Sequence, residues 1–183
     1  MAAIAVAAEV SVETIYLSIG GKASLVRYLV EAALSGTDDP VPALQREGVA
    51  EIRSEPDPRR KLRLFAAMAR SMLERIAPIW QVVMEAAPTD AELSSVVAEL
   101  QGRHAGSMRR FVIENLADAG RLRPEISDDV AADVLWAMNS PEVYRLLVVG
   151  RGWNGETFES WLADAWQRLL LDDDVSPTKP MRK

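Results

Sequence analysis

Apolar residues recur at intervals of three and four positions along almost the whole chain, and the strict alternation typical of β-strands is scarce. This pattern predicts an all-α fold without a sheet. Two stretches rich in proline, glycine, serine and aspartate interrupt it, at residues 35–42 and 54–58. We therefore expect a head at residues 1–36, a loop-rich connection at 37–58, a helical body at 59–171 and a disordered tail at 172–183.

Local signals predict where the body helices begin and end. A helix after Pro58 should end near Pro78, with a short helix following over residues 79–87, because proline lacks a backbone donor. The expected N-caps of the next helices are Asp90, Ser127 and Ser140, and Ala119-Gly120 should end the helix that starts at Asp90. The last helix carries a broad apolar face over residues 158–170.

The head divides into three short expected helices, at residues 2–9, 11–18 and 22–34. A break near Val10 and a capping hydroxyl at Ser11 let the second helix turn sharply from the first, as in a helix-turn-helix unit. In such a unit the second helix lies in the major groove of DNA. The head is therefore a candidate DNA-binding module.

The head also carries a motif at defined spacing: Ile4-Ala5, Ala8, Val10-Ser11, Thr14-Ile15-Tyr16, Lys22 and Leu25. This series resembles the head signature of the TetR family of bacterial transcriptional regulators, which are all-helical homodimers with a larger ligand-binding and dimerisation domain. The resemblance implies that residues 11–18 form the recognition helix and that Tyr16 and Lys22 contact phosphates. The residues expected at the double-stranded DNA operator are Ser11, Val12, Glu13, Thr14, Tyr16, Ser18 and Lys22.

Some features of the head differ from the family pattern. Glu9 stands at the position of the family's turn glycine, and Ile19 stands where an aromatic residue is usual. Residues 1–37 carry two basic and three acidic side chains, a net charge of −1, and the family's first helix would precede Ala2. An alternative is therefore a helical small-molecule-binding or interaction protein that has the same fold but does not bind DNA.

The C-terminal segments 140–147, 150–153 and 159–162 also resemble actinobacterial members of this family. The resemblance implies that the last two long helices of each subunit form a four-helix bundle across a two-fold axis. The apolar face of the last helix is wider than one core seam needs. The residues expected at this homodimer interface are Phe158, Trp161, Leu162, Trp166 and Leu169; burial of the tryptophans inside one subunit is the alternative.

The middle helices offer a candidate pocket for a small apolar ligand. Its expected lining combines adaptable methionines with aromatic rings: Phe65, Met68, Met72, Trp80, Met84, Met108 and Phe111. His104, which is the only histidine, and Asn139 are candidate polar contacts. The alternatives are that His104 is a hydrogen-bonded core residue and that the methionines and aromatic rings are ordinary core. The expected function is a ligand-responsive repressor that a small apolar molecule releases from its operator.

Composition limits the other possibilities. The 183 residues are 49% hydrophobic, enough for one substantial core, and a net charge of −6 means that any contact with nucleic acid must be local. The chain lacks cysteine, an export signal and any run of about 20 apolar residues, so we expect a soluble cytoplasmic protein that does not contact the membrane.

No motif supports catalysis. Gly20-Gly-Lys22 lacks the first glycine and the hydroxyl residue of a phosphate-binding loop, because Tyr16 and Ala23 occupy those positions. A single histidine cannot supply two Glu-x-x-His pairs for a di-iron bundle, and no Gly-x-Ser-x-Gly elbow occurs. We therefore expect no enzyme activity, no cofactor and no metal.

Overall fold

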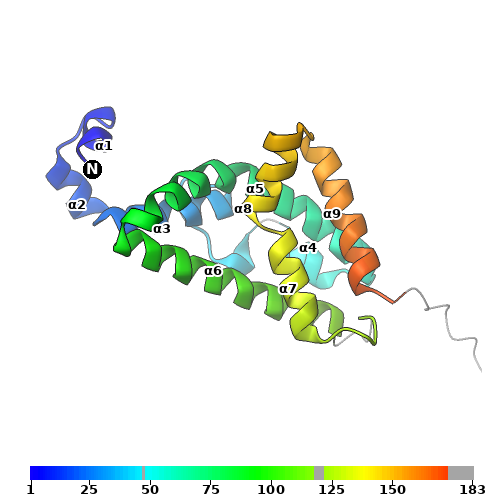
Figure 1. Cartoon of the computed structure of the whole chain (residues 1–183). Helices are drawn as coiled ribbons and strands as arrows, with labels where there is room; N and C mark the ends of the chain where they lie inside the picture. The colour runs from blue at the N-terminus through cyan, green and yellow to red at the C-terminus, as the bar shows by residue number, and fades with distance from the viewer. Residues whose placement is uncertain (47, 118–121, 173–183) are drawn as a thin grey trace, which may run out of the picture.

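The computed structural model describes residues 1–46, 48–117 and 122–172, and within these ranges the chain is all-helical (Figure 1). The elements in chain order are α1 (Ala2–Ala7), α2 (Val12–Ser18), α3 (Lys22–Ser35), η1 (Ala43–Gln45), α4 (Val49–Ser54), α5 (Pro58–Ala86), η2 (Ala87–Thr89), α6 (Ala91–Val112), η3 (Ile113–Ala117), α7 (Asp128–Met138), α8 (Pro141–Tyr144), η4 (Arg145–Val149) and α9 (Gly155–Leu170). An isolated bridge between Leu122 and Leu171 is the only β-type pairing among the described residues.

The head consists of α1, α2 and the start of α3, and α1 and α2 project from one end of the molecule (Figure 1). The Ser11 hydroxyl caps α2 by accepting the backbone N–H of Thr14 at 3.0 Å. Glu9 lies in the turn between α1 and α2 with φ of 55°, a left-handed conformation that glycine adopts with less strain. Ala5 and Ile15 are buried between the two helices. The predicted short helices and the Ser11 cap are therefore present.

Helix α3 runs from the head into the body, where it packs against α5 and α6 (Figure 1). It ends at Gly36, which has φ of 74° and serves as a left-handed C-cap. The Arg75 guanidinium donates a hydrogen bond from Nε to the carbonyl of Ala33 at 2.6 Å, which satisfies one of the last carbonyls of α3. The end of α3 is thus fixed to α5.

Helix α5 is the longest of the described helices and is the central helix of the body. Asp57 caps it by accepting the N–H groups of Arg59 and Arg60, and Pro58 occupies the first turn, where no donor is needed. The predicted end near Pro78 is wrong, because the helix continues to Ala86. Loss of one backbone hydrogen bond at Pro78 is offset by burial of Trp80 and Val83, which extend the apolar face of the helix.

The connection between head and body is partly helical, because it contains η1 and α4. Ile52 of α4 is buried, and this apolar contact attaches the short helix to the body. Within the body, Asp90, Ser127 and Ser140 cap α6, α7 and α8 as predicted. The predicted helix end at Ala119-Gly120 and most of the predicted tail, residues 173–183, lie outside the described residues.

The core lies between α5, α6, α7 and α9. Phe65 stacks on Trp166 of α9 with ring centroids 5.2 Å apart, and Tyr144 meets Phe158 edge-on at 5.0 Å. Among the described residues, none of the helices has the length and apolar character needed to cross a membrane.

Candidate functional site

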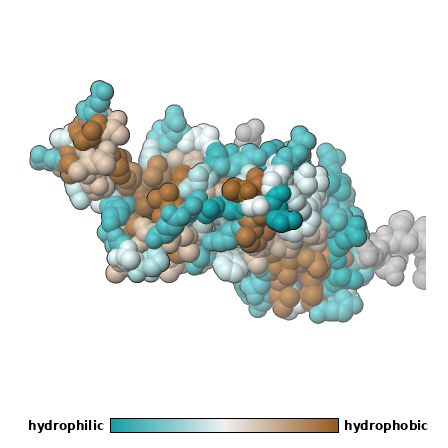
Figure 2. Space-filling model, turned by 45° about the horizontal axis from the view of Figure 1, so that its top comes forward, coloured by the Kyte–Doolittle hydropathy of each residue, from teal (hydrophilic) through white to brown (hydrophobic). Residues whose placement is uncertain are grey.

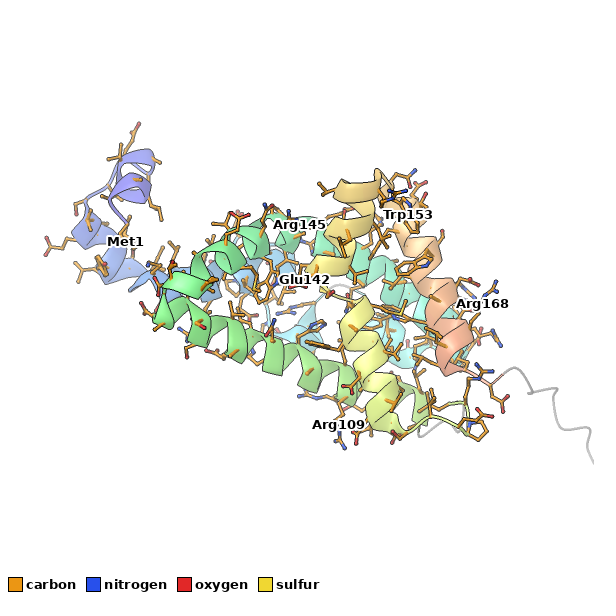
Figure 3. All side chains as sticks on the ribbon, viewed as in Figure 1. Met1, Arg109, Glu142, Arg145, Trp153 and Arg168 are labelled. Carbon is orange, nitrogen blue, oxygen red and sulfur yellow. The ribbon has the colours of Figure 1, made fainter. Side chains whose placement is uncertain are left out.

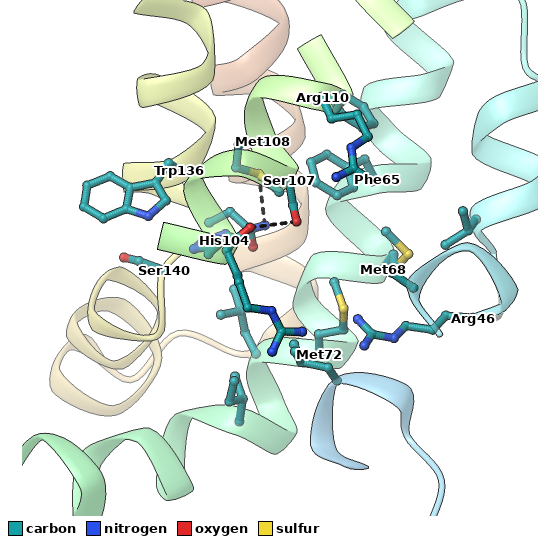
Figure 4. A pocket seen from close by; sticks show the side chains of 18 of the residues that line it. Arg46, Phe65, Met68, Met72, His104, Ser107, Met108, Arg110, Trp136 and Ser140 are labelled. Atoms are coloured by element: carbon teal, nitrogen blue, oxygen red, sulfur yellow. Dashed lines mark hydrogen bonds between the residues drawn. The ribbon is translucent and has the colours of Figure 1, made fainter. Parts of the chain in front are cut away.

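A cavity of about 320 Å³ lies in the body, mainly between α5 and α6, and residues of the connection after α3 and of the start of α8 line its two ends (Figure 4). It brings together most of the residues predicted as ligand contacts: Phe65, Met68, Met72, Trp80, His104, Met108, Phe111 and Asn139. Met84 is absent from this lining and its side chain is 37% exposed, so its placement in the pocket is corrected. The neighbouring residue Val83, and not Met84, lies on the buried face of α5.

Aromatic rings and methionines form the apolar walls of the cavity. Phe65 and Phe111 stack with ring centroids 4.2 Å apart, which joins α5 to α6. Met68 and Met72 follow Phe65 along α5, and Figure 4 shows both of them beside the cavity. Methionine side chains adapt to ligands of different shape, so these walls suit an apolar group without fixing its outline.

One end of the cavity is polar but carries little free charge. The Trp80 indole Nε1 donates to Glu142 Oε1 at 2.7 Å, which ties α5 to the first turn of α8. Asn139 is buried, and its amide nitrogen lies 3.8 Å from Met108 Sδ. Burial lowers the pKa of His104, and the nearby Glu142 carboxylate opposes this effect. His104 is therefore neutral at pH 7 and offers one donor and one acceptor to a ligand.

The opposite end of the cavity is charged, and the pattern of the sequence did not predict this. Arg46 donates from its guanidinium to Glu31 Oε2 at 2.9 Å, and Arg103 forms an ion pair with Glu31 Oε1. Glu31 lies on α3, Arg103 on α6 and Arg46 in the connection that precedes α4. Arg46 is 15 positions and Arg103 is 72 positions away from Glu31 in sequence, so no local pattern indicates that they contact it.

Asn115 also lines the cavity and hydrogen-bonds to a buried lysine behind it. Lys61 is 7% exposed, and its Nζ donates to Asn115 Oδ1 at 3.0 Å. Burial lowers the pKa of Lys61, while Glu55 raises it by a smaller amount. Asn115 follows Met108 and Phe111 at helical spacing on the same face, so the helical period could have identified it as a lining residue.

The residues predicted to contact DNA all have exposed side chains, mostly on α2. Ser11 and Thr14 already hydrogen-bond to each other at 2.8 Å, and the Ser18 hydroxyl donates to the Thr14 carbonyl. The Tyr16 side chain is 52% exposed. Val12 and Glu13 are exposed as well, whereas Lys22 forms an ion pair with Asp90 at the start of α6.

A row of ion pairs connects the head helix α3 to the cavity helix α6. Its members are Lys22 with Asp90, Arg27 with Glu99, and Glu31 with Arg103. The middle pair is bidentate from one guanidinium to one carboxylate oxygen, at 2.9 and 2.7 Å. Since α6 supplies one wall of the cavity, the row provides a direct link between the cavity and the head.

The predicted dimer residues have different environments. Phe158, Leu162 and Trp166 are fully buried within the subunit, so their assignment to an interface is corrected: α9 packs this face on α5. Trp161 is half-buried and contacts Trp153 edge-on, with ring centroids 5.8 Å apart. Leu169 is 48% exposed. Only Trp161 and Leu169 from this set therefore remain accessible.

Comparison with protein-family models, with curated proteins and with solved structures finds no significant match to this chain. Across the described ranges, no three His, Asp or Glu side chains come together in a way that could hold a metal ion.

Proposed function

We propose that this protein is a ligand-responsive transcriptional regulator that binds double-stranded DNA through α2, as its resemblance to the TetR family implies. The observation that carries the proposal is the combination of a projecting head with a cavity-bearing body, joined by one helix, α3 (Figure 1). Such an arrangement lets an event in the cavity change the position of the head.

The head supplies surface features that fit a DNA groove. Helix α2 begins at the Ser11 cap, and its exposed side includes Val12, Glu13 and Tyr16. Space-filling colours also show apolar residues on the surface of the projecting head (Figure 2). Apolar side chains can contact thymine methyl groups, and a tyrosine hydroxyl can donate to a phosphate. Lys22 reaches a phosphate only by leaving Asp90, so DNA contact and the α3–α6 row compete for it.

A homodimer would place two heads on the half-sites of a palindromic operator. Trp161 and Leu169 lie two helical turns apart on one side of α9, and Leu146 and Val149 of η4 are also exposed. This apolar surface supports association through α9 and η4. Sedimentation of L169E and W161E variants should show monomers where the wild-type chain forms dimers.

The test of the proposed function is binding to a promoter fragment from the protein's own locus, measured by fluorescence anisotropy over a range of salt concentrations. Y16A should weaken binding about five- to tenfold, as expected for loss of one phosphate hydrogen bond. E13Q should strengthen it, because it removes a negative charge that faces the DNA. R168Q is the matched control, because Arg168 lies at the opposite end of the molecule from Met1 (Figure 3). Failure of all fragments to bind would refute the proposal.

A second candidate function is a small-molecule-binding protein of the same fold that does not bind DNA. The observation in its favour is the charge of the head: Glu9 and Glu13 are exposed, and Lys22 is already paired with Asp90. A chain that binds a ligand in the cavity, yet fails to bind any promoter fragment at low salt, would support this candidate over the regulator.

A further inference from the structure

The charges that line the cavity do not cancel. Four arginines and three glutamates contribute to its walls: Arg46, Arg53, Arg103 and Arg110 against Glu31, Glu114 and Glu142. Glu142 lies at the far end, where it accepts the Trp80 N–H and is exposed to solvent. At the end where α3, α6 and the connection meet, Arg46 and Arg103 face the single carboxylate of Glu31, which leaves an excess of one positive charge there.

At that end one carboxylate serves two guanidinium groups. Glu31 uses Oε2 for Arg46 and Oε1 for Arg103, so both of its oxygens are engaged. The Arg46 side chain is only 14% exposed. Burial lowers its pKa, and the charge of Arg103 lowers it further against the opposing effect of Glu31. A largely buried guanidinium that shares its counter-ion is favourably placed to receive a second anion.

The apolar walls begin directly beside this pair. Figure 4 shows Arg46 extending to the side of the cavity where Met68 and Met72 lie. The volume of about 320 Å³ is at the small end of ligand sites. At roughly 30 Å³ for each water-sized group, it accommodates about ten non-hydrogen atoms.

From this geometry we infer that the cavity binds a medium-chain amphipathic acid, with its apolar chain between the methionines and aromatic rings and its carboxylate on Arg46 and Arg103 in competition with Glu31. Glu31 takes one N–H from each of the two guanidinium groups, and a ligand carboxylate placed between Arg46 and Arg103 reproduces these two bonds. The ligand is thus an anion with an apolar body, more specific than the small apolar molecule that the sequence suggests.

Competition with Glu31 has a direct consequence for the head. Glu31 belongs to α3, and its ion pair with Arg103 is the member of the α3–α6 row nearest the cavity. When the ligand carboxylate takes Arg103, α3 loses this contact with α6. The effect on the head rests on the proposed function, whereas binding of the acid does not.

The first experiment is calorimetric titration of the whole chain with three probes of matched length: octanoate, octanamide and octylammonium. Octanoate should bind at least tenfold more tightly than octanamide, a difference of about 1.4 kcal/mol, and octylammonium should bind more weakly still. Equal affinity for octanoate and octanamide would overturn the inference, because it would show that only the apolar chain is recognised. Preference for octylammonium would overturn it in favour of a cation at Glu142.

Three variants separate specific recognition from general charge effects. R46Q should weaken octanoate binding about tenfold and leave octanamide unchanged. R109Q is the matched control, because Arg109 lies on α6, pairs with Asp129 and does not line the cavity. E31Q should tighten octanoate binding, because it removes the competing carboxylate. Circular dichroism verifies that each variant is folded. Equal losses in R46Q and R109Q, or weaker octanoate binding by E31Q, would refute the inference.

The calorimetry needs no DNA, so its result is independent of the proposed function. If octanoate binds as expected and no promoter fragment does, the ligand site stands and the regulator is refuted. If a promoter fragment binds and octanoate does not, the ligand site is refuted and the DNA-binding function stands. Where both bind, octanoate should change the DNA affinity of the wild-type chain and leave that of E31Q unaltered.

Discussion

Replacement of Asn115 with leucine leaves the Lys61 ammonium group buried without its amide acceptor. Lys61 is 7% exposed, and within the described ranges the 3.0 Å bond to Asn115 is the only hydrogen bond identified for its ammonium group. Loss of a hydrogen bond to a charged group costs about 1.5–3 kcal/mol. Asn115 also donates to the Phe111 carbonyl at 3.0 Å, which adds about 1 kcal/mol. We therefore expect N115L to lower the free energy of unfolding by about 3 kcal/mol at pH 7.

The matching variant K61M removes the buried charge and leaves only the amide oxygen of Asn115 unpaired, which costs about 1–3 kcal/mol. The double variant K61M/N115L replaces both groups with apolar side chains. It should unfold within about 1 kcal/mol of the wild type, because paired polar groups in a core can be exchanged for apolar ones at little net cost. The single losses therefore exceed the loss in the double variant by about 3–5 kcal/mol, which is the expected coupling between Lys61 and Asn115.

The free energy of unfolding should depend on pH through Lys61. Burial lowers the pKa of Lys61 below its usual 10.5. Between the lowered value and 10.5 the unfolded chain binds more protons than the folded one, so stability rises with pH across this window. N115L lowers the pKa of Lys61 further and should gain more stability between pH 7 and about pH 10 than the wild type does. K61M lacks this contribution and serves as the baseline for all other groups.

Urea unfolding followed by far-UV circular dichroism at the two pH values measures all four proteins. Purely additive losses in the double variant would refute the coupling. A loss in N115L that is no smaller at about pH 10 than at pH 7 would show that the buried charge is not the cause.

Three further variants test other parts of the structure, each by urea unfolding. F65A removes a ring stacked on Phe111 and should lower the free energy of unfolding by about 3–5 kcal/mol. Because the void joins the cavity, F65A should also improve binding of decanoate relative to octanoate. An unchanged preference would contradict the placement of Phe65 in the cavity wall. G36A forces a side chain into the left-handed C-cap of α3 and should lower the free energy of unfolding by about 1–2 kcal/mol. G102A lies at an open position of α6 and should raise it by about 1 kcal/mol. Equal effects of the two variants would refute the role of the left-handed backbone at Gly36. D57A should cost about 1 kcal/mol through loss of the α5 cap, and no change would show that the cap is dispensable.

The sequence predicted those features of the fold that depend on neighbouring residues. Ser11, Asp90, Ser127 and Ser140 were recognised as caps because each bonds an amide within three positions. The continuation of α5 through Pro78 was not predicted, because it depends on the burial of residues beyond the proline by other helices. Local chemistry thus set the starts of helices, and tertiary contacts decided how far this one extends.

The candidate site divides in the same way. The apolar lining was predicted because Phe65, Met68 and Met72 repeat along one face of a helix. The Glu31 contacts with Arg46 and Arg103 join three separate segments, and no periodicity reports them. The same limit explains the interface error, since an apolar stripe on α9 does not indicate whether α5 or a second subunit covers it.

Although α5 is continuous in space, we expect Pro78 to divide it into parts of different local stability. Proline contributes no amide proton, and the Glu74 carbonyl one turn earlier has no helical donor. The segment before this point is attached to α9 through Arg70 and Glu159. The segment after it carries Trp80 at the end of the cavity. Amide hydrogen exchange should therefore be faster over residues 79–86 than over 62–77, so a ligand that fills the cavity should slow exchange most in the last two turns of the helix.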